Sequence, residues 1–432
     1  MKRYPEYKDS HIAWLGKIPS HWEIIRLKYT GSFRHGLTYS PADLSDNKGV
    51  LVLRSSNIQS NKLDFNDCVY VKNVSQDLML KNGDIIICAS NGNANLVGKC
   101  AYIDNNIVAS FGSFMWRYRT NLLDKFAYYL LQVCIPPYKS LFTTSTINQL
   151  TAKTIGKIYI PLPPLSEQDK IARYLDYKVS RINKLISLRK KQLIDLAELK
   201  KVIINNSVTK GLNPNAELKQ SGVDILGEIP AHWEISRIKR ICKGIITGTT
   251  PPGVKEEFFS ANGLAWYTPG DLGENLYINK AKKYLSTEGA KFVKVIPKNS
   301  VLMVGIGTIG KICVSDIECS TNQQINAIIC DDNIINFKYL AFYLRAIKDY
   351  ILYTAKSTTL PIINQSETKQ IIIPLPPLSE QNQIAAYLDG ICGKIDRLIT
   401  LYEREISLFD ELKARLISDC VTGQLDLRDI II

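Results

Sequence analysis

The sequence predicts an α+β fold in which two mixed α/β domains alternate with two long, coiled-coil-like helices, so that the chain has an internal pseudo-two-fold repeat. Three observations support this prediction. Two sequence blocks occur twice in the same order, the stretches between them differ, and each copy of the second block is followed by a long run of helical apolar periodicity. The repeat therefore decides the architecture before any single element is considered.

The repeated blocks are too long to be a coincidence. Ile-Pro-Ser-His-Trp-Glu-Ile-Ile-Arg-Leu-Lys at 18–28 returns as Ile-Pro-Ala-His-Trp-Glu-Ile-Ser-Arg-Ile-Lys at 229–239, 211 residues later. Pro-Leu-Pro-Pro-Leu-Ser-Glu-Gln at 161–168 returns unchanged at 374–381, 213 residues later. The chain is therefore a tandem duplication of a unit of about half its length, a pseudo-dimer within one chain.

The stretches between these blocks have diverged, because residues 30–157 barely resemble residues 241–370. Their pattern predicts short strands and short amphipathic helices. The strands are expected at 85–88 and 301–304, and the helices at 126–133 and 339–347. The chain then divides into residues 1–160 (first domain), 161–215 (central helical spacer), 216–373 (second domain) and 374–432 (C-terminal helical spacer).

Each Pro-Leu-Pro-Pro sequence marks the start of a long helix, because proline continues neither a helix interior nor a strand ladder. Ser166 and Ser379 are expected to be the N-cap residues. Apolar residues then recur at steps of three and four, as in a coiled-coil seam. In the first helix these residues are Ile171, Leu175, Val179, Ile182, Ile186, Leu193, Leu196 and Ile203. In the second they are Ile384, Leu388, Ile395, Ile399, Tyr402, Ile406, Phe409, Leu412 and Leu416.

We expect the two helices to pair with each other, although packing of each helix on its own domain is an alternative. Residues 165–205 carry ten basic and five acidic side chains, whereas residues 378–420 carry five basic and eight acidic ones. Helices of opposite charge attract along the edges of their seam. A helix of about 40 residues forms a rod of roughly 60 Å, longer than one turn of DNA duplex at roughly 34 Å.

The overall charge favours a polyanion, nucleic acid first, as the binding partner. The 54 basic and 41 acidic residues give a net charge of +13. No apolar run reaches the ~18 residues of a membrane span, and the N-terminus lacks a signal peptide, so we expect a cytoplasmic protein. The ten cysteines form no Cys-x-x-Cys pair and the chain has four histidines, so we expect reduced cysteines and no metal site.

Three enzyme-like motifs each lack a part that the chemistry needs. Gly305–Gly310 fits Gly-x-Gly-x-x-Gly, but a strand-like run follows where a dinucleotide site requires a helix, so we expect a hairpin. The same segment with Lys311 matches a P-loop, except that Ile312 stands where Ser or Thr must bind magnesium. Ile135 stands where the Asn-Pro-Pro-Tyr motif of adenine methyltransferases has asparagine. We therefore expect no catalytic residues in this chain.

The repeated blocks resemble the conserved regions of type I restriction-modification specificity (S) subunits, over essentially the whole chain. The helix-start motif carries over as Pro163, Pro164, Leu165, Glu167 and Gln168, and as Pro376, Pro377, Leu378, Glu380 and Gln381. These residues are expected to start and cap the long helices. The domain-start motif carries over as His21 with Trp22 and His232 with Trp233, and we expect these side chains to pack where domain and helix meet.

The resemblance implies that the two domains are target-recognition domains, which read the two halves of a split, asymmetric site in double-stranded DNA. It implies that the long helices form an antiparallel pair that acts as a ruler and docks two methyltransferase (M) subunits. Restriction and translocase (R) subunits then add to this core. S-adenosylmethionine, ATP and Mg²⁺ are expected on those partners, and no cofactor is expected on this non-catalytic chain.

DNA contacts are expected from basic and amide side chains in polar, loop-like contexts. Residues 1–160 carry 19 basic and 11 acidic residues, and residues 216–373 carry 18 and 15. The candidates in the first domain are Arg34, Arg54, Asn57, Asn91, Asn93, Arg117 and Arg119. Those in the second are Thr249, Thr250, Lys255, Lys282, Lys283, Lys311, Asn322 and Gln323.

Three other functions remain open from the sequence. The first is an orphan, stand-alone DNA-binding protein without active partners, which copurification with a methyltransferase would separate from the main hypothesis. The second is a single-chain methyltransferase or nuclease, for which binding of S-adenosylmethionine by the isolated chain would be evidence. The third is a coiled-coil adaptor without DNA affinity, which the basic first domain argues against.

Overall fold

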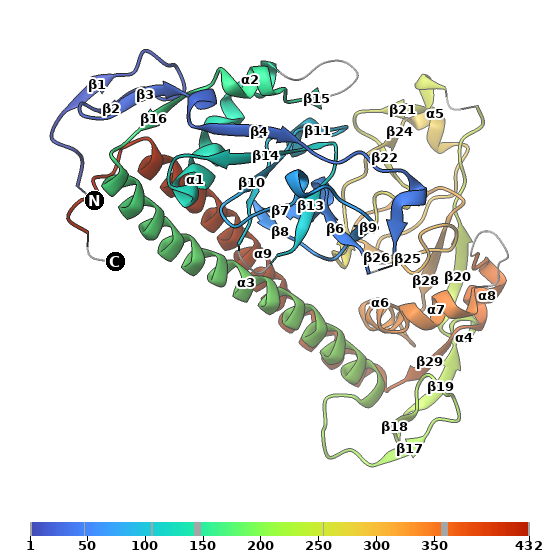
Figure 1. Ribbon diagram of the computed structural model, residues 1–432. Helices are drawn as coiled ribbons and strands as arrows, with labels where there is room; N and C mark the ends of the chain where they lie inside the picture. The colour runs from blue at the N-terminus through green and yellow to red at the C-terminus, as the bar shows by residue number, and fades with distance from the viewer. Residues whose placement is uncertain are drawn as a thin grey trace. The chain divides into compact units, whose positions relative to one another are not determined.

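The computed structural model describes residues 2–46, 48–104, 107–141, 148–253, 255–355 and 362–430. The chain forms two compact units, and each takes half of each long helix. Unit 1 contains residues 1–189 and 404–432, and unit 2 contains residues 190–403. The first helix is therefore continuous from one unit into the other, and so is the last (Figure 1).

Unit 1 contains two four-stranded sheets. The first has the order β12 (Cys100–Tyr102), β10 (Ile85–Cys88), β14 (Met115–Thr120) and β4 (Gly31–His35). The second has the order β13 (Ala109–Phe111), β6 (Val50–Leu53), β9 (Val69–Val71) and β5 (Leu44–Ser45). Strand β10 contributes to two cores, because Ile85 and Ile87 pack on the helical side while Ile86 and Cys88 pack in the second cluster.

Unit 2 repeats both strand orders. Its larger sheet runs β26 (Ile312–Ser315), β25 (Val301–Val304), β28 (Ile325–Cys330) and β20 (Cys242–Thr247), with β23 (Tyr277–Ile278) added beside β26. Its second sheet runs β27 (Cys319–Thr321), β22 (Leu264–Tyr267), β24 (Tyr284–Leu285) and β21 (Phe259–Ser260). The two domains therefore share one topology although their sequences have diverged.

The smaller elements also occur in equivalent pairs. Unit 1 has β1 (Tyr7–Asp9) with β2 (Lys17–Pro19), β3 (Glu23–Arg26) with β16 (Tyr159–Leu162), α1 (Asp124–Cys134) and α2 (Ala152–Gly156). Unit 2 has β17 (Leu218–Gln220) with β18 (Glu228–Pro230), β19 (Glu234–Arg237) with β29 (Ile372–Leu375), α6 (Phe337–Ala346) and α8 (Gln365–Gln370).

Each unit also contains further short elements. Unit 1 adds β7 (Ile58–Gln59) with β8 (Lys62–Leu63) and β11 (Ser90–Asn91) with β15 (Asn148–Gln149). Unit 2 adds α4 (Ile238–Ile241), α5 (Thr287–Ala290) and α7 (Lys348–Thr354). Short 3₁₀ turns, among them Ser55–Asn57 and Gln76–Leu78, connect strands in unit 1.

The expected strands and short helices are confirmed as β10, β25, α1 and α6. The glycine-rich segment after β25 is confirmed as a hairpin, because β25 pairs antiparallel with β26. Gly307 and Gly310 lie in it at φ of +85° and +80°, a conformation that L side chains rarely adopt. No helix N-terminus follows the glycines, so the segment has no dinucleotide fingerprint.

The long helices are α3 (Leu165–Lys210) and α9 (Leu378–Val421). They start one residue earlier than the expected N-caps, so the prediction that Ser166 and Ser379 cap them was wrong. The carbonyl of Pro164 accepts hydrogen bonds from the amides of Glu167 and Gln168, and that of Pro377 accepts from Glu380 and Gln381. Proline therefore occupies the cap position and the serine lies in the first turn.

In each unit, half of α3 lies alongside half of α9 and runs in the opposite direction (Figure 1). In unit 1, Arg189 pairs with Glu405 at 2.5 Å and Lys413 donates to Asn183 at 3.3 Å. In unit 2, Lys200 pairs with Asp396 at 2.6 Å. The expected antiparallel pairing, with ion pairs at the edges of the seam, is confirmed.

The seam itself differs from the expected one at a single residue. Leu412 is 51% exposed, so its assignment to the seam was wrong. A strict alternation of four and three along α9 from Ile395 leads to Lys413, whose amine reaches α3. Because Leu412 lies one position away from that seam, it points to solvent.

Candidate nucleic-acid interface

The glutamate of the helix-start motif binds the His-Trp pair of the domain-start motif. In unit 1, Glu167 accepts hydrogen bonds from Tyr4 Oη at 2.7 Å and Trp22 Nε1 at 3.0 Å, and its other oxygen lies 2.7 Å from His21 Nε2. Trp22 is fully buried. Burial acts to raise the pKa of Glu167, but the hydrogen bonds from Tyr4, His21 and Trp22 outweigh it and lower the pKa below its usual value.

Unit 2 repeats this arrangement with one donor fewer. Glu380 accepts from Trp233 Nε1 at 3.0 Å and lies 2.8 Å from His232 Nε2. Gly211, which follows α3 at φ +74°, lies against this group, and a Cβ there would sit 3.2 Å from Trp233. These aromatic residues pack where domain and helix meet, as expected. That the glutamate accepts their hydrogen bonds was not predicted from the sequence.

The glutamine of the motif ties the long helix to the domain's own short helix. Gln168 accepts from the amide of Leu123, the N-cap residue of α1, and donates to Pro163. Gln381 accepts from the amide of Asn336, the N-cap residue of α6, and donates to Pro376. Both glutamines are nearly inaccessible, so this part of the motif is structural.

The loops at one end of the sheets share a set of backbone hydrogen bonds in the two units. The amide of Gly36 donates to Met115 and that of Leu37 to Phe111, as Gly248 donates to Ile325 and Thr249 to Thr321. The amide of Gly112 donates to Leu53, as Asn322 donates to Tyr267. We call this end the loop edge: in unit 1 it comprises residues 36–40, 54–57, 89–93 and 112–114, and in unit 2 it comprises residues 248–252, 268–271, 305–311 and 322–324.

Glycine at the start of the loop edge is a steric requirement in both units. A Cβ on Gly36 would lie 2.1 Å from the carbonyl oxygen of Gly112, and a Cβ on Gly248 would lie 2.1 Å from Thr321 Oγ1. The first loop therefore crosses directly over the turn between the two sheets. These close approaches hold the loops in one arrangement.

In unit 2, the structure brings several candidates together at the loop edge. Thr250 Oγ1 donates to Gln323 Oε1 at 2.5 Å, and Gln323 is exposed. Asn322 is 8% exposed and binds Gln324, so it shapes the turn. Lys311 donates to the carbonyl of Pro269 and Lys282 to that of Gly270, both in the neighbouring loop.

Thr249 lies in the loop edge, where its amide donates to the carbonyl of Thr321, whereas the last two candidates of unit 2 lie near β21. Lys255 pairs with Glu257 at 3.5 Å, and the amine of Lys283 lies 5.3 Å from the ring centre of Phe259. The structure places neither residue in a loop of the loop edge. They remain candidates for contacts with phosphates, which reach over a wider surface than contacts with bases.

In unit 1, four candidates lie at the loop edge. Asn91 Nδ2 donates to Ser55 Oγ at 3.1 Å, which joins two of its loops, and Asn93 is exposed. Arg54 pairs with Asp67 at 2.6 Å. Asn57 is fully buried and donates to the carbonyls of Asp64 and Asp67, so its amide is engaged within the fold.

The remaining three candidates of unit 1 are arginines on β4 and β14, the strands that adjoin the loop edge. Arg34 pairs with Asp77 at 2.5 Å, and Arg117, 8% exposed, donates to the carbonyl of Asp77. Arg119 binds both oxygens of Asp84 at 2.7 Å, and the Asp84 side chain is fully buried. Arg34 has an exposed guanidinium, whereas Arg117 and Arg119 are engaged within the fold.

Replacing Arg119 with alanine is expected to lower stability and leave DNA affinity unchanged within about twofold. The variant leaves the buried Asp84 carboxylate without its two strongest donors, at a cost of about 1–3 kcal/mol in the free energy of unfolding. Urea unfolding and duplex titration measure the two quantities. A loss of affinity above tenfold at unchanged stability would show that Arg119 contacts DNA.

Sequence reasoning missed the unit 1 residues that stand where Thr249, Thr250, Asn322 and Gln323 stand in unit 2. By the hydrogen bonds of the loop edge these are Leu37, Thr38, Gly112 and Ser113, followed by Phe114 in the position of Gln324. None of them is basic, and the diverged sequences do not align here. One signal was available, because Gly36 and Gly248 are 212 residues apart, close to the spacing of the repeated blocks.

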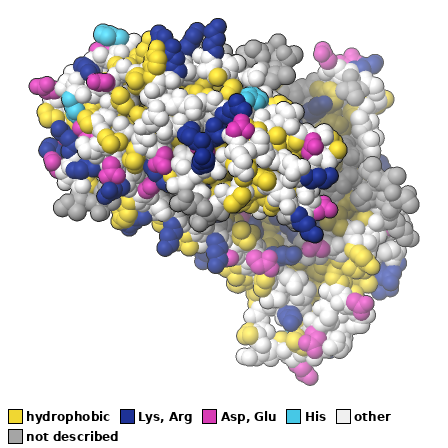
Figure 2. Space-filling model, in the orientation of Figure 1, with side chains coloured by type: hydrophobic (Ala, Val, Ile, Leu, Met, Phe, Trp, Pro, Cys, Tyr) yellow, Lys and Arg dark blue, Asp and Glu magenta, His cyan; other side chains and the backbone are white. Residues whose placement is uncertain are grey.

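Charged side chains on the visible face do not form one continuous basic patch. In Figure 2, groups of Lys and Arg side chains lie beside Asp or Glu side chains. Within the described ranges, no group of three or more His, Cys, Asp and Glu residues could hold a metal ion. Among the same residues, no helix is both long and apolar enough to span a membrane.

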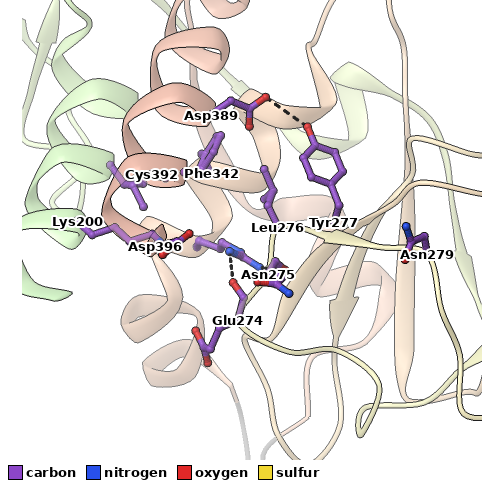
Figure 3. A pocket seen from close by; sticks show the side chains of 13 residues that line it. Lys200, Glu274, Asn275, Leu276, Tyr277, Asn279, Phe342, Asp389, Cys392 and Asp396 are labelled. Atoms are coloured by element: carbon purple, nitrogen blue, oxygen red, sulfur yellow. Dashed lines mark hydrogen bonds and ion pairs between the residues drawn. The ribbon is translucent and has the colours of Figure 1, made fainter. Parts of the chain in front are cut away.

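A hollow of about 430 Å³ lies in unit 2, between the end of α3, the start of α9, α6 and residues 274–279 (Figure 3). Most of its charged side chains are engaged by neighbours. Lys200 pairs with Asp396, Asp389 pairs with Lys338, and Arg345 donates to the carbonyls of Glu274 and Asn275. These pairs brace the domain against its helices.

Exposed leucines recur at the same positions of the two long helices, which defines a second repeated surface. Their exposed fractions are 45% and 39% for Leu185 and Leu398, 49% and 48% for Leu188 and Leu401, and 49% and 51% for Leu199 and Leu412. Each unit holds one of each pair: Leu185, Leu188 and Leu412 in unit 1, and Leu398, Leu401 and Leu199 in unit 2. We call each set a leucine face.

The two helices bring each leucine face together in the same way. Lys413 next to Leu412 reaches Asn183, two residues before Leu185, and Lys200 next to Leu199 reaches Asp396, two residues before Leu398. Exposed apolar side chains clustered on a helix pair are typical of a surface that another helix covers. The same exposed apolar arrangement therefore occurs once in each unit.

The family model for the type I restriction modification DNA specificity domain matches residues 19–196 and again residues 230–405. The chain therefore belongs to the family of type I restriction-modification specificity subunits, whose function is DNA sequence specificity. Each match contains the helix-start motif and the domain-start tryptophan of one repeat, together with the loop edge between them. The fold class predicted from the sequence is confirmed.

Individual relatives resemble the chain over its whole length. The putative type I restriction enzyme MjaX specificity subunit of Methanocaldococcus jannaschii is 27% identical, with 98% of each chain covered. One solved structure is described as the structural basis of complex assembly and conformational transition of the type I R-M system. It has a TM-score of 0.72 at 21% sequence identity, and the match covers 94% of this chain and 99% of that one. The HsdS subunit from Thermoanaerobacter tengcongensis has a TM-score of 0.52 at 20% identity, over 94% and 98%.

Proposed function

We propose that this chain is the non-catalytic subunit that directs a type I restriction-modification complex to a split, asymmetric DNA site. The observation that carries the proposal is the loop edge, which has the same hydrogen-bonded frame in both units but different side chains. Symmetric dimers read palindromes because their halves present the same surface. A pseudo-dimer with unlike loop edges would read two unlike half-sites, with unread base pairs between them.

The target-reading surface of each domain is proposed to be its loop edge. Its loops carry exposed amide and hydroxyl groups on a rigid frame, and such groups read base edges in the major groove. Arg34 and Lys255 lie elsewhere and would supply phosphate contacts, which position the protein without reading sequence. This assignment divides the candidate residues into readers and positioners.

The leucine faces are proposed to dock two methyltransferase subunits, one per unit. Two equivalent faces on one chain explain why two copies of a single partner would bind. S-adenosylmethionine would belong to these partners, and ATP with Mg²⁺ to the restriction and translocase subunits that join them. The complex would act on cytoplasmic DNA, and this chain would contribute no catalytic group.

The test is methyl transfer by purified components. The chain, its genomically adjacent methyltransferase and labelled S-adenosylmethionine are expected to methylate host DNA together, and neither protein is expected to do so alone. A stand-alone DNA-binding protein would bind duplex but not copurify with the methyltransferase. Methyl transfer by the isolated chain would overturn the assignment of a non-catalytic subunit.

A further inference from the structure

Phe114 stands at the loop edge of unit 1 with 65% of its surface exposed. It is the last residue of the turn that links β13 to β14. Its backbone lies beside the loop that contains Asn91, because its carbonyl accepts the amides of Ala89 and Ser90. A large aromatic ring is therefore presented to solvent among candidate DNA-reading side chains.

The turn that carries Phe114 is held rigidly. The amide of Gly112 donates to Leu53 at 2.9 Å, the amide of Met115 donates to Gly112 at 2.9 Å, and Ala89 donates to Phe114 at 2.9 Å. Gly36 crosses over the turn with no space for a Cβ. The backbone below the ring is thus fixed before binding, and immobilising the ring costs little further entropy.

Unit 2 has an amide where unit 1 has this ring. Gln324 occupies the equivalent position, because its carbonyl accepts the amide of Gly305 as that of Phe114 accepts the amide of Ala89. The backbone of the turn is the same in both units. The side chain at this position can form hydrogen bonds in unit 2 and is apolar in unit 1. A position that changes in this way between two readers on one frame is expected to distinguish their targets.

We propose that Phe114 reads a thymine in one half-site, by apolar contact with the 5-methyl group of the base. The inference rests on the proposed function, since it assumes that the loop edge faces DNA. The thymine methyl is the apolar group that the major groove displays, and phenylalanine is among the side chains that contact it. Phe114 is thus a specificity-determining residue that carries no charge and makes no hydrogen bond through its side chain.

The experiment measures duplex binding by the full chain in complex with its methyltransferase. Each thymine of the methylated site is replaced in turn by uracil, which removes only the methyl group. One replacement is expected to weaken binding of the unmodified protein about tenfold, and Phe114→Ala is expected to weaken binding to the intact site by a similar factor. On that uracil duplex the variant and the unmodified protein should bind equally.

Val108→Ala is the matched control, because Val108 is 78% exposed in the same unit but precedes β13 at the end opposite to the loop edge. It should bind like the unmodified protein. A Phe114→Ala complex with full affinity, or one equally weakened on unrelated duplex, would overturn the inference while leaving the proposed function intact. If Phe114→Ala weakened binding but no replacement of thymine by uracil did, the proposed contact with the thymine methyl group would be overturned. Failure of the unmodified complex to prefer a split site would overturn both proposals.

Discussion

Replacing Glu167 with alanine is expected to lower the stability of unit 1 by about 2–5 kcal/mol, because the buried donors Tyr4 Oη and Trp22 Nε1 lose their acceptor. For a unit of about 200 residues this corresponds to a fall in Tm of roughly 5–15 °C. Differential scanning calorimetry of the full chain measures it. Glu167→Gln keeps an acceptor oxygen in place and should recover part of the loss.

The repeat supplies an internal control. Glu380→Ala removes two hydrogen bonds, one of them from His232 with a 54% exposed side chain that water can solvate, so the loss should be smaller. A Glu380 effect equal to or larger than that of Glu167 would contradict the account. The sign of the pH dependence follows from the lowered pKa of Glu167: the stabilisation is full above the unfolded pKa of about 4.3 and is lost as pH falls through the folded value.

The second large effect is expected from the double variant Leu398→Ser with Leu401→Ser. These side chains are 39% and 48% exposed, so folding should be nearly unaffected. The leucine face of unit 2 should then bind its methyltransferase subunit about 2–4 kcal/mol more weakly, or roughly 30- to 1,000-fold in Kd. Native mass spectrometry should show one bound subunit where the unmodified chain binds two.

The equivalent double variant Leu185→Ser with Leu188→Ser should also leave one bound subunit, and the quadruple variant should leave none. Val295→Ser changes a side chain of unit 2 that is 45% exposed and lies outside the long helices, and it should retain both subunits. Two bound subunits on the quadruple variant would show that the partner docks elsewhere on the chain.

The repeated architecture was predictable because its signals are local in sequence. Each of these signals affects only the conformation of residues close to it in the chain. The signals are proline before a helix, apolar residues at steps of three and four, and turn glycines such as Gly310. The start of each long helix could be placed at its Pro-Leu-Pro-Pro sequence for the same reason, although the capping residue was predicted wrongly. The error at Leu412 arose because a leucine next to a seam position fits the periodic pattern, and only the neighbouring helix shows that Lys413 faces it.

The contacts of Glu167 and Phe114 depend on segments far apart in the sequence. Glu167 meets Trp22 145 residues away, and local pattern rules carry no information about such a pair. A signal existed, since His-Trp and Glu-Gln recur together in both halves at nearly the same separation. For Phe114 no comparable signal existed, because its equivalence to Gln324 is defined by hydrogen bonds to other strands.

The central claim is that one chain presents two unlike readers on one repeated frame. Modified-base sequencing of genomic DNA, from a host that carries the partner genes and has this gene intact or deleted, tests it most directly. The account predicts that N6-methyladenine at a single split, asymmetric motif is present in the intact host and vanishes on deletion. Methylation that persists after deletion, or a lost motif that is continuous or palindromic, would contradict it.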